Sequence, residues 1–298
     1  MRTYFVFFFV LVKLTSCQRR IVGGTDAEDG MYPYAAFILV NKVASCTGSL
    51  LTEEWVLTAA HCMGNKPLLI EVIAGAANKR SEKAQSRKGK EVVIHGKYAP
   101  MQLAGYDIAL IKVDNPFNMS SLNIGTISLS SEEWPQDNQM HVNCKVLGWG
   151  RISTNGKSPD VLQHQDVVAK HGTDGCPCVK RFEQKRLVCI EGMVGKGPCM
   201  GDSGGPLVCN GKEVGITHMG FNRQKCNPIY HQIPKTTCGD KDTVVTYLYL
   251  CPELNWIRKF VPVVPAKPES CSAIVHRRYN LYFITVLEIF VVYVVNIF

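Results

Sequence analysis

Residues 199–206 read Cys-Met-Gly-Asp-Ser-Gly-Gly-Pro, and this stretch constrains the fold and the chemistry more than any other. Glycines closely flank Ser203, which leaves its hydroxyl exposed and backbone N–H groups open on either side. A nucleophile needs both features, because its oxygen must reach a carbonyl and nearby donors must hold the oxyanion that forms. The stretch also fits the Gly-x-Ser-x-Gly pattern of a nucleophile elbow, so by itself it leaves two hydrolase folds open.

The order of the other candidate residues along the chain decides between these two folds. His61 lies in Leu-Thr-Ala-Ala-His-Cys at 57–62, and Asp107 lies in Tyr-Asp-Ile-Ala-Leu at 106–110. An elbow hydrolase carries its acid and then its histidine after the serine. After Ser203 the only histidine that follows an aspartate is His276, which lies beside the apolar C-terminal tail. This order excludes the elbow fold.

The order His, Asp, Ser, together with the three local motifs, resembles the chymotrypsin–trypsin family of serine proteases. The resemblance covers residues 21–260 and implies an all-β fold: two six-stranded antiparallel β-barrels with the active site between them, closed by a helix at 253–260. Residues 195–199 resemble the corresponding segment of insect chymotrypsin-like or elastase-like members. Further matching segments are 20–24 (Arg-Ile-Val-Gly-Gly), 46–50 (Cys-Thr-Gly-Ser-Leu), 55–57 (Trp-Val-Leu), 148–150 (Gly-Trp-Gly) and 255–257 (Asn-Trp-Ile).

The apolar pattern of the chain is independently typical of β-structure. Short runs rich in Val and Ile, broken by turn residues, predict strands. Many such runs with few helical stretches predict a barrel or a sandwich, and the pattern alone goes no further. The runs lie at 35–40, 55–58, 68–73, 91–95, 108–113, 142–147, 206–209, 214–217 and 244–250.

The resemblance assigns catalytic roles to matching residues. Ser203 is expected to attack the scissile carbonyl, while His61 takes the serine proton and passes it to the leaving amine. Asp107 is expected to orient the imidazole, and the apolar run after it favours burial, where a carboxylate needs a partner. The backbone N–H groups of Gly201 and Ser203 are expected to form the oxyanion hole. The implied activity is serine endopeptidase, with a non-catalytic homologue acting as a binding or adaptor protein as the alternative.

The junction Arg20–Ile21 predicts a zymogen. In the family, cleavage there frees the ammonium group of the new N-terminus, which pairs with the aspartate before the catalytic serine. That aspartate is Asp202 here, so the uncut chain is expected to be nearly inactive. The partners implied are protein or peptide substrates, an activating protease and protease inhibitors.

The residues expected at the substrate pocket predict an apolar preference. Gly197 occupies the pocket floor in the resemblance, where trypsin-like members carry an aspartate, so a basic side chain would be desolvated without compensation. Gly220 keeps the entrance open, and His218 stands where the family has a serine that supports the catalytic aspartate. Two further departures are Pro228, in place of a glycine that borders the pocket, and an apparent insertion at 234–252.

Thirteen cysteines indicate an oxidising compartment. The one-residue spacing of the Cys-Pro-Cys at 176–178 does not suit a zinc knuckle, and neither a metal nor a cofactor is implied. The resemblance implies the pairs Cys46–Cys62, Cys144–Cys209 and Cys199–Cys226, with Cys189 bonded to Cys176 or Cys178. Cys238 and Cys251 remain near each other in the sequence and are expected to pair.

The two ends of the chain predict an extracellular protein. Residues 1–17 resemble a secretory signal peptide, with Arg2, an apolar core at 4–12 and small residues at 15–17, which leaves 18–20 as a short activation peptide. Residues 261–280 are expected to be a linker. In the tail, 281–298, thirteen of eighteen residues are Leu, Ile, Val or Phe. It is expected to be either a lipid-anchor signal or a single membrane span, and either of these would hold the secreted enzyme at the cell surface.

Charge and modification signals add little to the function. The formal net charge is +8, and much of it lies in residues 78–90. This run is interpreted as a solvated loop or, alternatively, a contact surface for an anionic partner. No aromatic residue interleaves it, so no nucleic-acid function is inferred. Asn118 begins an Asn-Met-Ser acceptor site for N-glycosylation.

Overall fold

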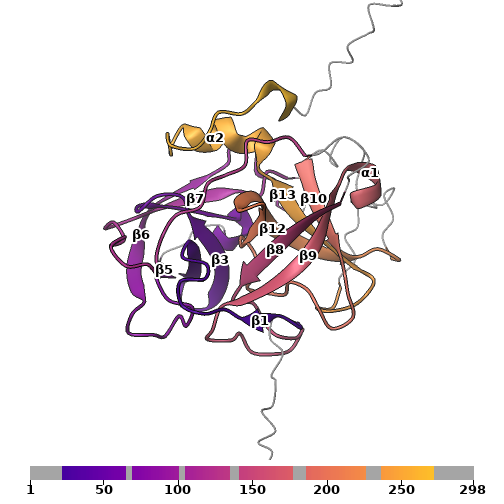
Figure 1. The fold of residues 1–298 in the computed structure, drawn as a ribbon, viewed down its shortest axis with the longest axis horizontal. Helices are drawn as coiled ribbons and strands as arrows, with labels where there is room; N and C mark the ends of the chain where they lie inside the picture. Colours follow the sequence, from indigo (N-terminus) through magenta and orange to yellow (C-terminus); the bar gives the residue numbers. More distant parts are fainter. Residues whose placement is uncertain are drawn as a thin grey trace, which may run out of the picture.

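The computed structural model describes residues 22–64, 69–100, 105–134, 141–176, 186–225 and 236–271. The expected signal peptide, activation peptide and C-terminal tail lie outside these residues, as do Cys178, Cys226 and Pro228. The described chain forms two antiparallel β-barrels, one in the N-terminal half and one in the C-terminal half (Figure 1). The fold class expected from the sequence is therefore confirmed.

The first barrel closes through six strands in the order β2-β3-β4-β7-β6-β5. Its interior holds aliphatic side chains from every second strand position, such as Ile38, Val72 and Ile111, all with no exposed surface. This alternation is what one buried face of a strand requires. The strands are β2 (Ala35–Val40), β3 (Ala44–Leu50), β4 (Trp55–Thr58), β5 (Ile70–Ala74), β6 (Gln85–Ile94) and β7 (Ala109–Val113).

The second barrel follows the order β9-β10-β13-β12-β11-β8, and a further pairing of β8 with β9 closes it. A short strand, β1 (Thr25–Asp26), is added to β9. All seven residues of the central strand β13 are buried. The strands are β8 (His141–Gly148), β9 (Gln163–His171), β10 (Leu187–Glu191), β11 (Pro206–Cys209), β12 (Lys212–Asn222) and β13 (Thr243–Tyr249).

Helical segments are short and lie at the ends of strands. A 3-10 turn, η1 (Ala60–Met63), follows β4, and α1 (Gly172–Gly175) follows β9. After β13 come η3 (Cys251–Glu253) and α2 (Leu254–Arg258), which occupies part of the helix expected at 253–260. In the described residues no helix has the length and apolar character to cross a membrane.

The segment after α2 differs from the linker expected at 261–280. Val261, Val264 and Cys271 are buried and belong to the same hydrophobic cluster as the second barrel. The chain ends its described part with η4 (Glu269–Cys271), on the α2 side of the molecule (Figure 1). Its apolar residues cover the barrel, so the folded body extends at least to Cys271 instead of ending at residue 260.

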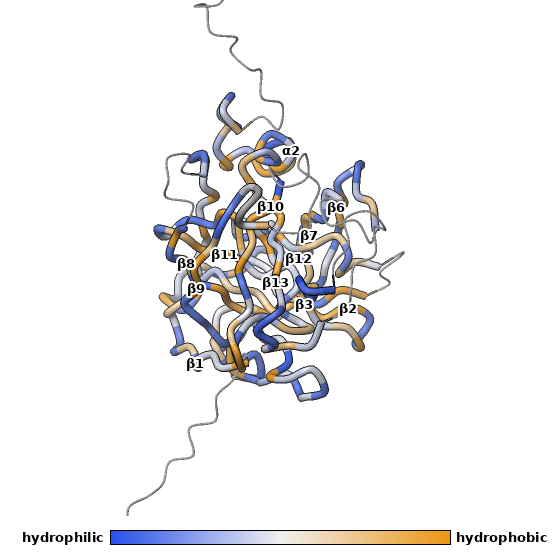
Figure 2. Tube along the Cα trace, turned by 90° about the vertical axis from the view of Figure 1, so that its right-hand side faces the viewer, coloured by the Kyte–Doolittle hydropathy of each residue, from blue (hydrophilic) through white to orange (hydrophobic). Residues whose placement is uncertain are grey.

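Polar residues lie mostly in the loops around the strands (Figure 2). The basic run expected as a loop at 78–90 is partly strand, because β6 begins at Gln85. Some of its charge is paired: Arg80 contacts Asp160 at 2.9 Å, and Lys83 contacts Asp29 at 3.8 Å.

The disulfides confirm three of the expected pairs and correct two. Cys46–Cys62, Cys144–Cys209 and Cys176–Cys189 form as expected. Cys199 bonds to Cys238 instead of Cys226, and Cys251 bonds to Cys271 instead of Cys238. The reason is that β13 runs between Cys238 and Cys251, and seven extended residues separate their ends by about 20 Å. The prediction of a Cys238–Cys251 bond from their closeness in the sequence was therefore wrong.

Candidate active site

His61 and Asp107 meet at the end of the first barrel. The backbone N–H of His61 donates to Asp107 Oδ1 at 2.7 Å. Its Nδ1 lies 2.6 Å from Oδ2 of the same carboxylate. A carboxylate can only accept, so Nδ1 carries the hydrogen and Nε2 is left as a proton acceptor. Asp107 is 1% exposed, whereas His61 keeps 35% of its side chain in solvent. This arrangement prepares His61 to act as a base.

A strained turn aims Asp107 at His61. Tyr106 has φ of 53°, and the N–H of Ile108 donates to the Tyr106 carbonyl at 2.8 Å. The Tyr106 ring stacks on the His95 ring, with ring centroids 4.6 Å apart. The guanidinium carbon of Arg186 lies over the Tyr106 ring, 3.2 Å from the ring centroid. Such stacking holds a left-handed residue in place, since strained backbone persists only where surroundings determine it.

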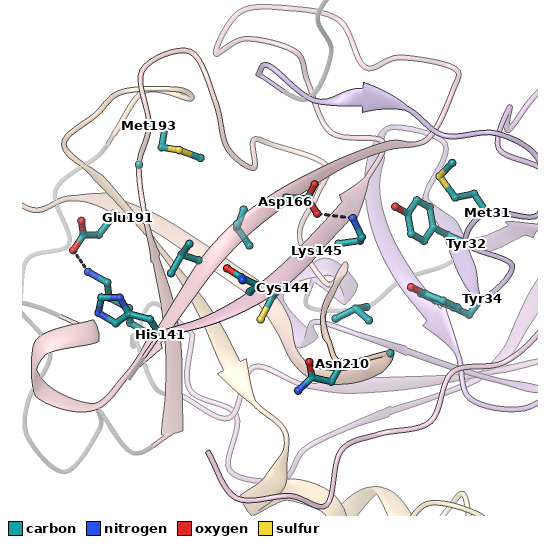
Figure 3. A pocket seen from close by; sticks show the side chains of 17 residues that line it. Met31, Tyr32, Tyr34, His141, Cys144, Lys145, Asp166, Glu191, Met193 and Asn210 are labelled. Carbon is teal, nitrogen blue, oxygen red and sulfur yellow. Dashed lines mark hydrogen bonds and ion pairs between the residues drawn. The ribbon is translucent and has the colours of Figure 1, made fainter. Parts of the chain in front are cut away.

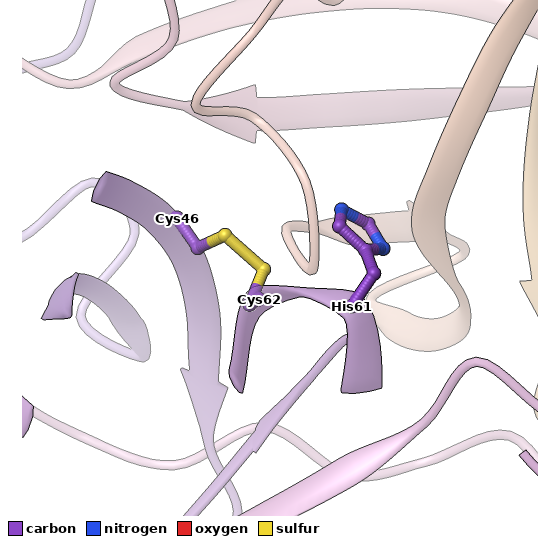
Figure 4. Close-up of side chains that lie close together, drawn as sticks. All are labelled: Cys46, His61 and Cys62. Carbon is purple, nitrogen blue, oxygen red and sulfur yellow. A yellow bond between two sulfur atoms is a disulfide. The ribbon is translucent and has the colours of Figure 1, made fainter. Parts of the chain in front are cut away.

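Ser203 lies on the second barrel but rests against the first. The N–H of Thr47, in β3, donates to the Ser203 carbonyl at 2.9 Å. The Sγ atom of Cys62 is 3.7 Å from that same carbonyl oxygen. Cys62 adjoins His61 on η1 and is bonded to Cys46, as Figure 4 shows. The serine loop therefore lies directly beside the turn that carries His61.

The glycines after Ser203 allow this close contact. Gly204 has φ of 78°, and a Cβ there would stand 2.6 Å from the Thr47 carbonyl oxygen. A Cβ at Gly205 would stand 2.6 Å from the Leu147 carbonyl oxygen. Only glycine fits where one backbone approaches another this closely. The Gly-rich motif thus places Ser203 at the junction of the two barrels.

The expected oxyanion donors occupy this loop. Gly201 adopts φ of 103°, and its carbonyl accepts from Thr47 Oγ1 at 3.0 Å. Within the described part of the chain, neither the N–H of Gly201 nor that of Ser203 donates to another residue. These N–H groups therefore remain available to a ligand.

Asp202 is buried between the serine loop and residues 148–150. Its carboxylate accepts from the N–H of Gly150 at 2.7 Å and from the N–H of Cys199 at 2.8 Å. A Cβ on Gly148 or Gly150 would overlap this carboxylate, which explains both glycines of the Gly-Trp-Gly segment. Burial raises the pKa of Asp202 to about 6, although the two N–H groups oppose the shift. An unpaired negative charge here is costly.

The beginning of the described chain lies close to this loop. Val22 forms a β-bridge with Gly197, whose N–H donates to the Val22 carbonyl at 3.0 Å. Gly197 leads directly to the Cys199–Asp202 turn, so the start of the expected mature chain runs beside the segment that holds Asp202. Arg20 and Ile21 lie outside the described residues.

Strand pairing corrects the expected surroundings of the pocket. Val245 lies directly opposite Gly220 across β12 and β13, and residues 243–249 are a barrel strand instead of part of an insertion. Side chains of directly opposite residues share one face of a sheet, so Val245 lies on the side left open by Gly220. Val245 is 5% exposed. The sequence analysis expected Pro228 at this position beside Gly220. The segment Val-Thr-Tyr at 245–247 offered the same pattern and was missed.

His218 approaches Asp107 from the second barrel. Its Nδ1 lies 2.5 Å from Asp107 Oδ2, and its side chain is 4% exposed. Burial would raise the pKa of Asp107, but the hydrogen bonds from His218 and His61 outweigh burial and hold it well below its usual range. The carboxylate is therefore ionised at neutral pH, with an imidazole on either side.

Two nearby donor clusters are already engaged. Cys46 and Cys62 lie beside His61, but their disulfide removes the thiolates that a metal would need (Figure 4). The donors of His61, Asp107 and His218 are hydrogen-bonded to one another. Because the donor atoms of both clusters are engaged in these bonds, we assign no metal site to either cluster.

The candidate glycosylation residue and one large groove share no residue with the candidate catalytic set. Asn118 is exposed, and its Oδ1 accepts from the N–H of Ser120 at 3.0 Å. A groove of about 980 Å³ runs along β8 and β9, with Tyr34 and the Lys145–Asp166 pair among its walls (Figure 3). Its lining includes none of the candidate catalytic residues.

Comparisons with known proteins agree with this geometry. A family model described as Trypsin matches residues 21–237. Brachyurin from Leptuca pugilator is 32% identical over 248 residues, covering 82% of this chain and 100% of that protein. Snake venom serine protease KN3 from Trimeresurus stejnegeri is 31% identical, covering 81% of this chain and 87% of its own length. Coagulation factor IX from Cavia porcellus is 31% identical, and the match covers 63% of this chain and 67% of that protein.

Proposed function

Because this chain belongs to the trypsin family of serine proteases, we propose that it is an active endopeptidase with Ser203, His61 and Asp107 as its catalytic residues. The observation that carries the proposal is the oriented imidazole: Asp107 binds both the N–H and the Nδ1 of His61. This contact leaves Nε2 as the basic atom beside the serine loop. A complete set of this kind favours catalysis over a purely adaptor role.

The proposed reaction has two halves, and in each of them His61 acts first as a base and then as an acid. His61 Nε2 removes the proton of Ser203 Oγ as that oxygen attacks the peptide carbonyl, and the N–H groups of Gly201 and Ser203 hold the oxyanion. The protonated His61 then gives its proton to the leaving amine, and Asp107 stabilises the imidazolium without taking the proton. A water molecule then attacks the acyl carbonyl and gives its proton to His61 Nε2. His61 returns that proton to Ser203 Oγ as the ester bond breaks and the carboxylic acid leaves.

Activation is proposed to require cleavage between Arg20 and Ile21. The motivation is the buried Asp202, whose only hydrogen-bond partners among the described residues are backbone N–H groups. The ammonium group of a new N-terminus at Ile21 would supply its missing counter-charge, and Val22 already lies beside Gly197. That ion pair would order the loop that carries the oxyanion donors.

The proposed preference is for apolar side chains before the scissile bond. Gly197, Gly220 and Val245 contribute no charge where the family contacts this side chain. A lysine or arginine would leave water without gaining a counter-ion. Val245 also narrows the space, which favours small and medium-sized side chains over large aromatic ones.

Secretion is proposed from the covalent structure. Five disulfides among the described residues suit an oxidising, extracellular environment. Exposed Asn118 is a proposed glycosylation site in the same setting.

Labelling with a fluorophosphonate, before and after limited cleavage by trypsin, tests the proposed function. The cut wild-type chain should become labelled on Ser203 and hydrolyse peptide amides, and its N-terminal sequence should begin at Ile21. A Ser203→Ala variant, cut in the same way, is the matched control and should do neither. A cut wild-type chain that is folded but neither labels nor hydrolyses would support the adaptor alternative.

A further inference from the structure

Arg186 and Glu253 form a buried ion pair beside the residue that precedes the proposed catalytic acid. Arg186 Nη2 donates to Glu253 Oε1 at 2.8 Å, and the two side chains are 11% and 6% exposed. We propose that Arg186 and Glu253 are positioning residues of the second barrel. Their ion pair clamps the Tyr106 ring and thereby holds the turn that aims Asp107 at His61. The proposal rests on the proposed function, since the clamp acts on the orientation of Asp107.

The turn at Tyr106 needs such a clamp because its backbone is strained. Tyr106 has φ of 53°, a left-handed conformation that costs a residue with a large side chain more than it costs glycine. Asp107 follows directly, so the direction of its side chain depends on whether this conformation is kept. A left-handed residue of this kind persists only where its surroundings determine it.

Two planar groups enclose the Tyr106 ring. The His95 ring lies within 7° of parallel to it, with the two centroids 4.6 Å apart. The guanidinium carbon of Arg186 lies 3.2 Å from the same centroid, whereas Lys97 Nζ lies 5.6 Å from it. One face of a phenol ring cannot hold both His95 and Arg186 at these distances, so they cover opposite faces. An aromatic face attracts a guanidinium, and the attraction is strongest where water is excluded.

Glu253 contacts both of these covering groups. Its Oε1 accepts from Arg186, and its Oε2 lies 3.6 Å from His95 Nε2. The Nδ1 atom of His95 accepts the N–H of Lys97 at 3.2 Å, so Nε2 carries the hydrogen and faces the carboxylate. Burial and the nearby Arg186 charge lower the pKa of His95 to about 4, so this imidazole is neutral. The Glu253 charge is therefore met chiefly by Arg186.

The clamp connects the two barrels. His95 follows β6 and Tyr106 precedes β7, so both belong to the first barrel. Arg186 directly precedes β10, and Glu253 lies in η3 after β13, so both belong to the second barrel. Because these two residues are anchored at the ends of barrel strands, they resist movement of the Tyr106 ring. The orientation of Asp107 therefore depends on the second barrel, which also carries the proposed nucleophile.

Removal of both charges together tests the proposal without leaving one of them buried and unpaired. The variant combines Arg186→Met with Glu253→Gln in the full chain, activated by cleavage. We expect its kcat to fall about 10- to 100-fold, the loss expected when a reacting group is displaced by up to about 1 Å. KM should stay near its wild-type value. The matched control, Lys145→Met with Asp166→Asn, removes an exposed pair on β8 and β9 and should leave kcat unchanged.

Variants of Tyr106 show whether the ion pair acts through the ring. Tyr106→Gly removes the ring and adopts left-handed φ without steric cost, so removal of the pair in this background should not lower kcat further. Tyr106→Phe keeps the ring, so removal of the pair should lower kcat as much as it does in wild type. A pair that only stabilises the fold would instead lower the thermal midpoint in both backgrounds and leave kcat per titrated active site unchanged.

Three outcomes would overturn the clamp. The first is wild-type kcat per titrated active site after removal of the pair, and the second is an equal loss in the matched control. The third is the same loss of kcat in the Tyr106→Gly and Tyr106→Phe backgrounds, since the pair would then act by another route.

A further variant decides the matter if the chain without the pair does not fold, as judged by its thermal midpoint. Arg186→Lys keeps a positive charge beside Glu253 but loses the flat guanidinium over the ring, so it should also lower kcat. An Arg186→Lys enzyme with wild-type kcat would then reject the proposal. A cut wild-type enzyme that never reacts with fluorophosphonate instead rejects the proposed function itself.

Discussion

Val245 is the residue on which the substrate preference is expected to depend most. It lies opposite Gly220, on the face of the sheet where the glycine leaves space. Replacing Val245 with Ala removes two methyl groups there and should favour larger side chains before the scissile bond. We expect the ratio of kcat/KM for Phe over Ala substrates to rise about tenfold, the size typical of a methylene or two in an apolar pocket.

A neighbouring variant provides the control for this prediction. Val244→Ala removes the same groups from an adjacent, fully buried position whose side chain faces the other side of β13. It should lower the thermal midpoint to a similar extent and leave the Phe/Ala ratio unchanged. A substrate profile in which both variants shift the ratio equally would show that loosened packing, and not the pocket, is responsible.

At the scale of single residues, the sequence predicted which candidate catalytic residues come together better than it predicted the surroundings of the pocket. His61, Asp107 and Ser203 lie together because their local motifs fix the turn, the strand end and the Gly-rich loop that carry them. The neighbour of Gly220 could not be chosen from the sequence, since both 228–230 and 245–247 offer a tyrosine at the right spacing. Only the hydrogen-bonded register of β12 with β13 distinguishes them.

Among the structural elements, the two disulfides that differed from expectation should have separate functions. Cys199–Cys238 ties the turn that binds Asp202 to the segment before β13, whereas Cys251–Cys271 ties the C-terminal segment to η3. Replacing both cysteines of either pair with serine should destabilise the protein by roughly 2–5 kcal/mol. Only loss of Cys199–Cys238 should also lower kcat per folded molecule, because it frees the oxyanion loop.

Active-site titration with fluorophosphonate, combined with urea unfolding, measures both quantities. The two double variants serve as controls for each other, since each removes one disulfide of the second barrel. Equal loss of kcat in both would contradict the separate roles. Retained kcat in both would mean that the Asp202 turn is held without its disulfide.

Strand boundaries were predictable where apolar residues run together. β4 and β11 match the expected 55–58 and 206–209 residue for residue. β3, β9 and β10 were not predicted. β3 carries Ser, Cys, Thr and Gly, and β9 alternates buried with polar outward positions, whereas β10 is a short apolar run that was not marked as a strand. Whether such segments form strands depends on closure of the barrel, which buries even small polar residues such as Thr47 and Ser49. That information is not local.

For the molecule as a whole, cleavage should change stability in a pH-dependent way. In the uncut chain the pKa of Asp202 is about 6, above its unfolded value, so its ionisation lowers stability as pH rises from about 4 to 6. Pairing with the ammonium of Ile21 would remove that loss. We expect cleavage to raise the thermal midpoint by several degrees at pH 7.5 and by much less at pH 4.

This measurement uses the Ser203→Ala background, so that the protein does not digest itself. An Arg20→Gln variant on that background, carried through the same protease treatment, controls for cleavage elsewhere. A gain in thermal midpoint that is as large at pH 4 as at pH 7.5 would mean that ordering of the N-terminus stabilises the fold without the Asp202 ion pair.

The Cys251–Cys271 bond also has a mechanical consequence. It closes a loop across a sequence separation of 20, and this loop contains α2 and the buried Val261 and Val264. A pull on the chain beyond Cys271 would pass through the two sulfur atoms to the end of β13, leaving the loop slack. β13 is paired with β10 on one side and β12 on the other. Tension would therefore enter the barrel through one of its most enclosed strands, and α2 would not peel away until the disulfide was reduced.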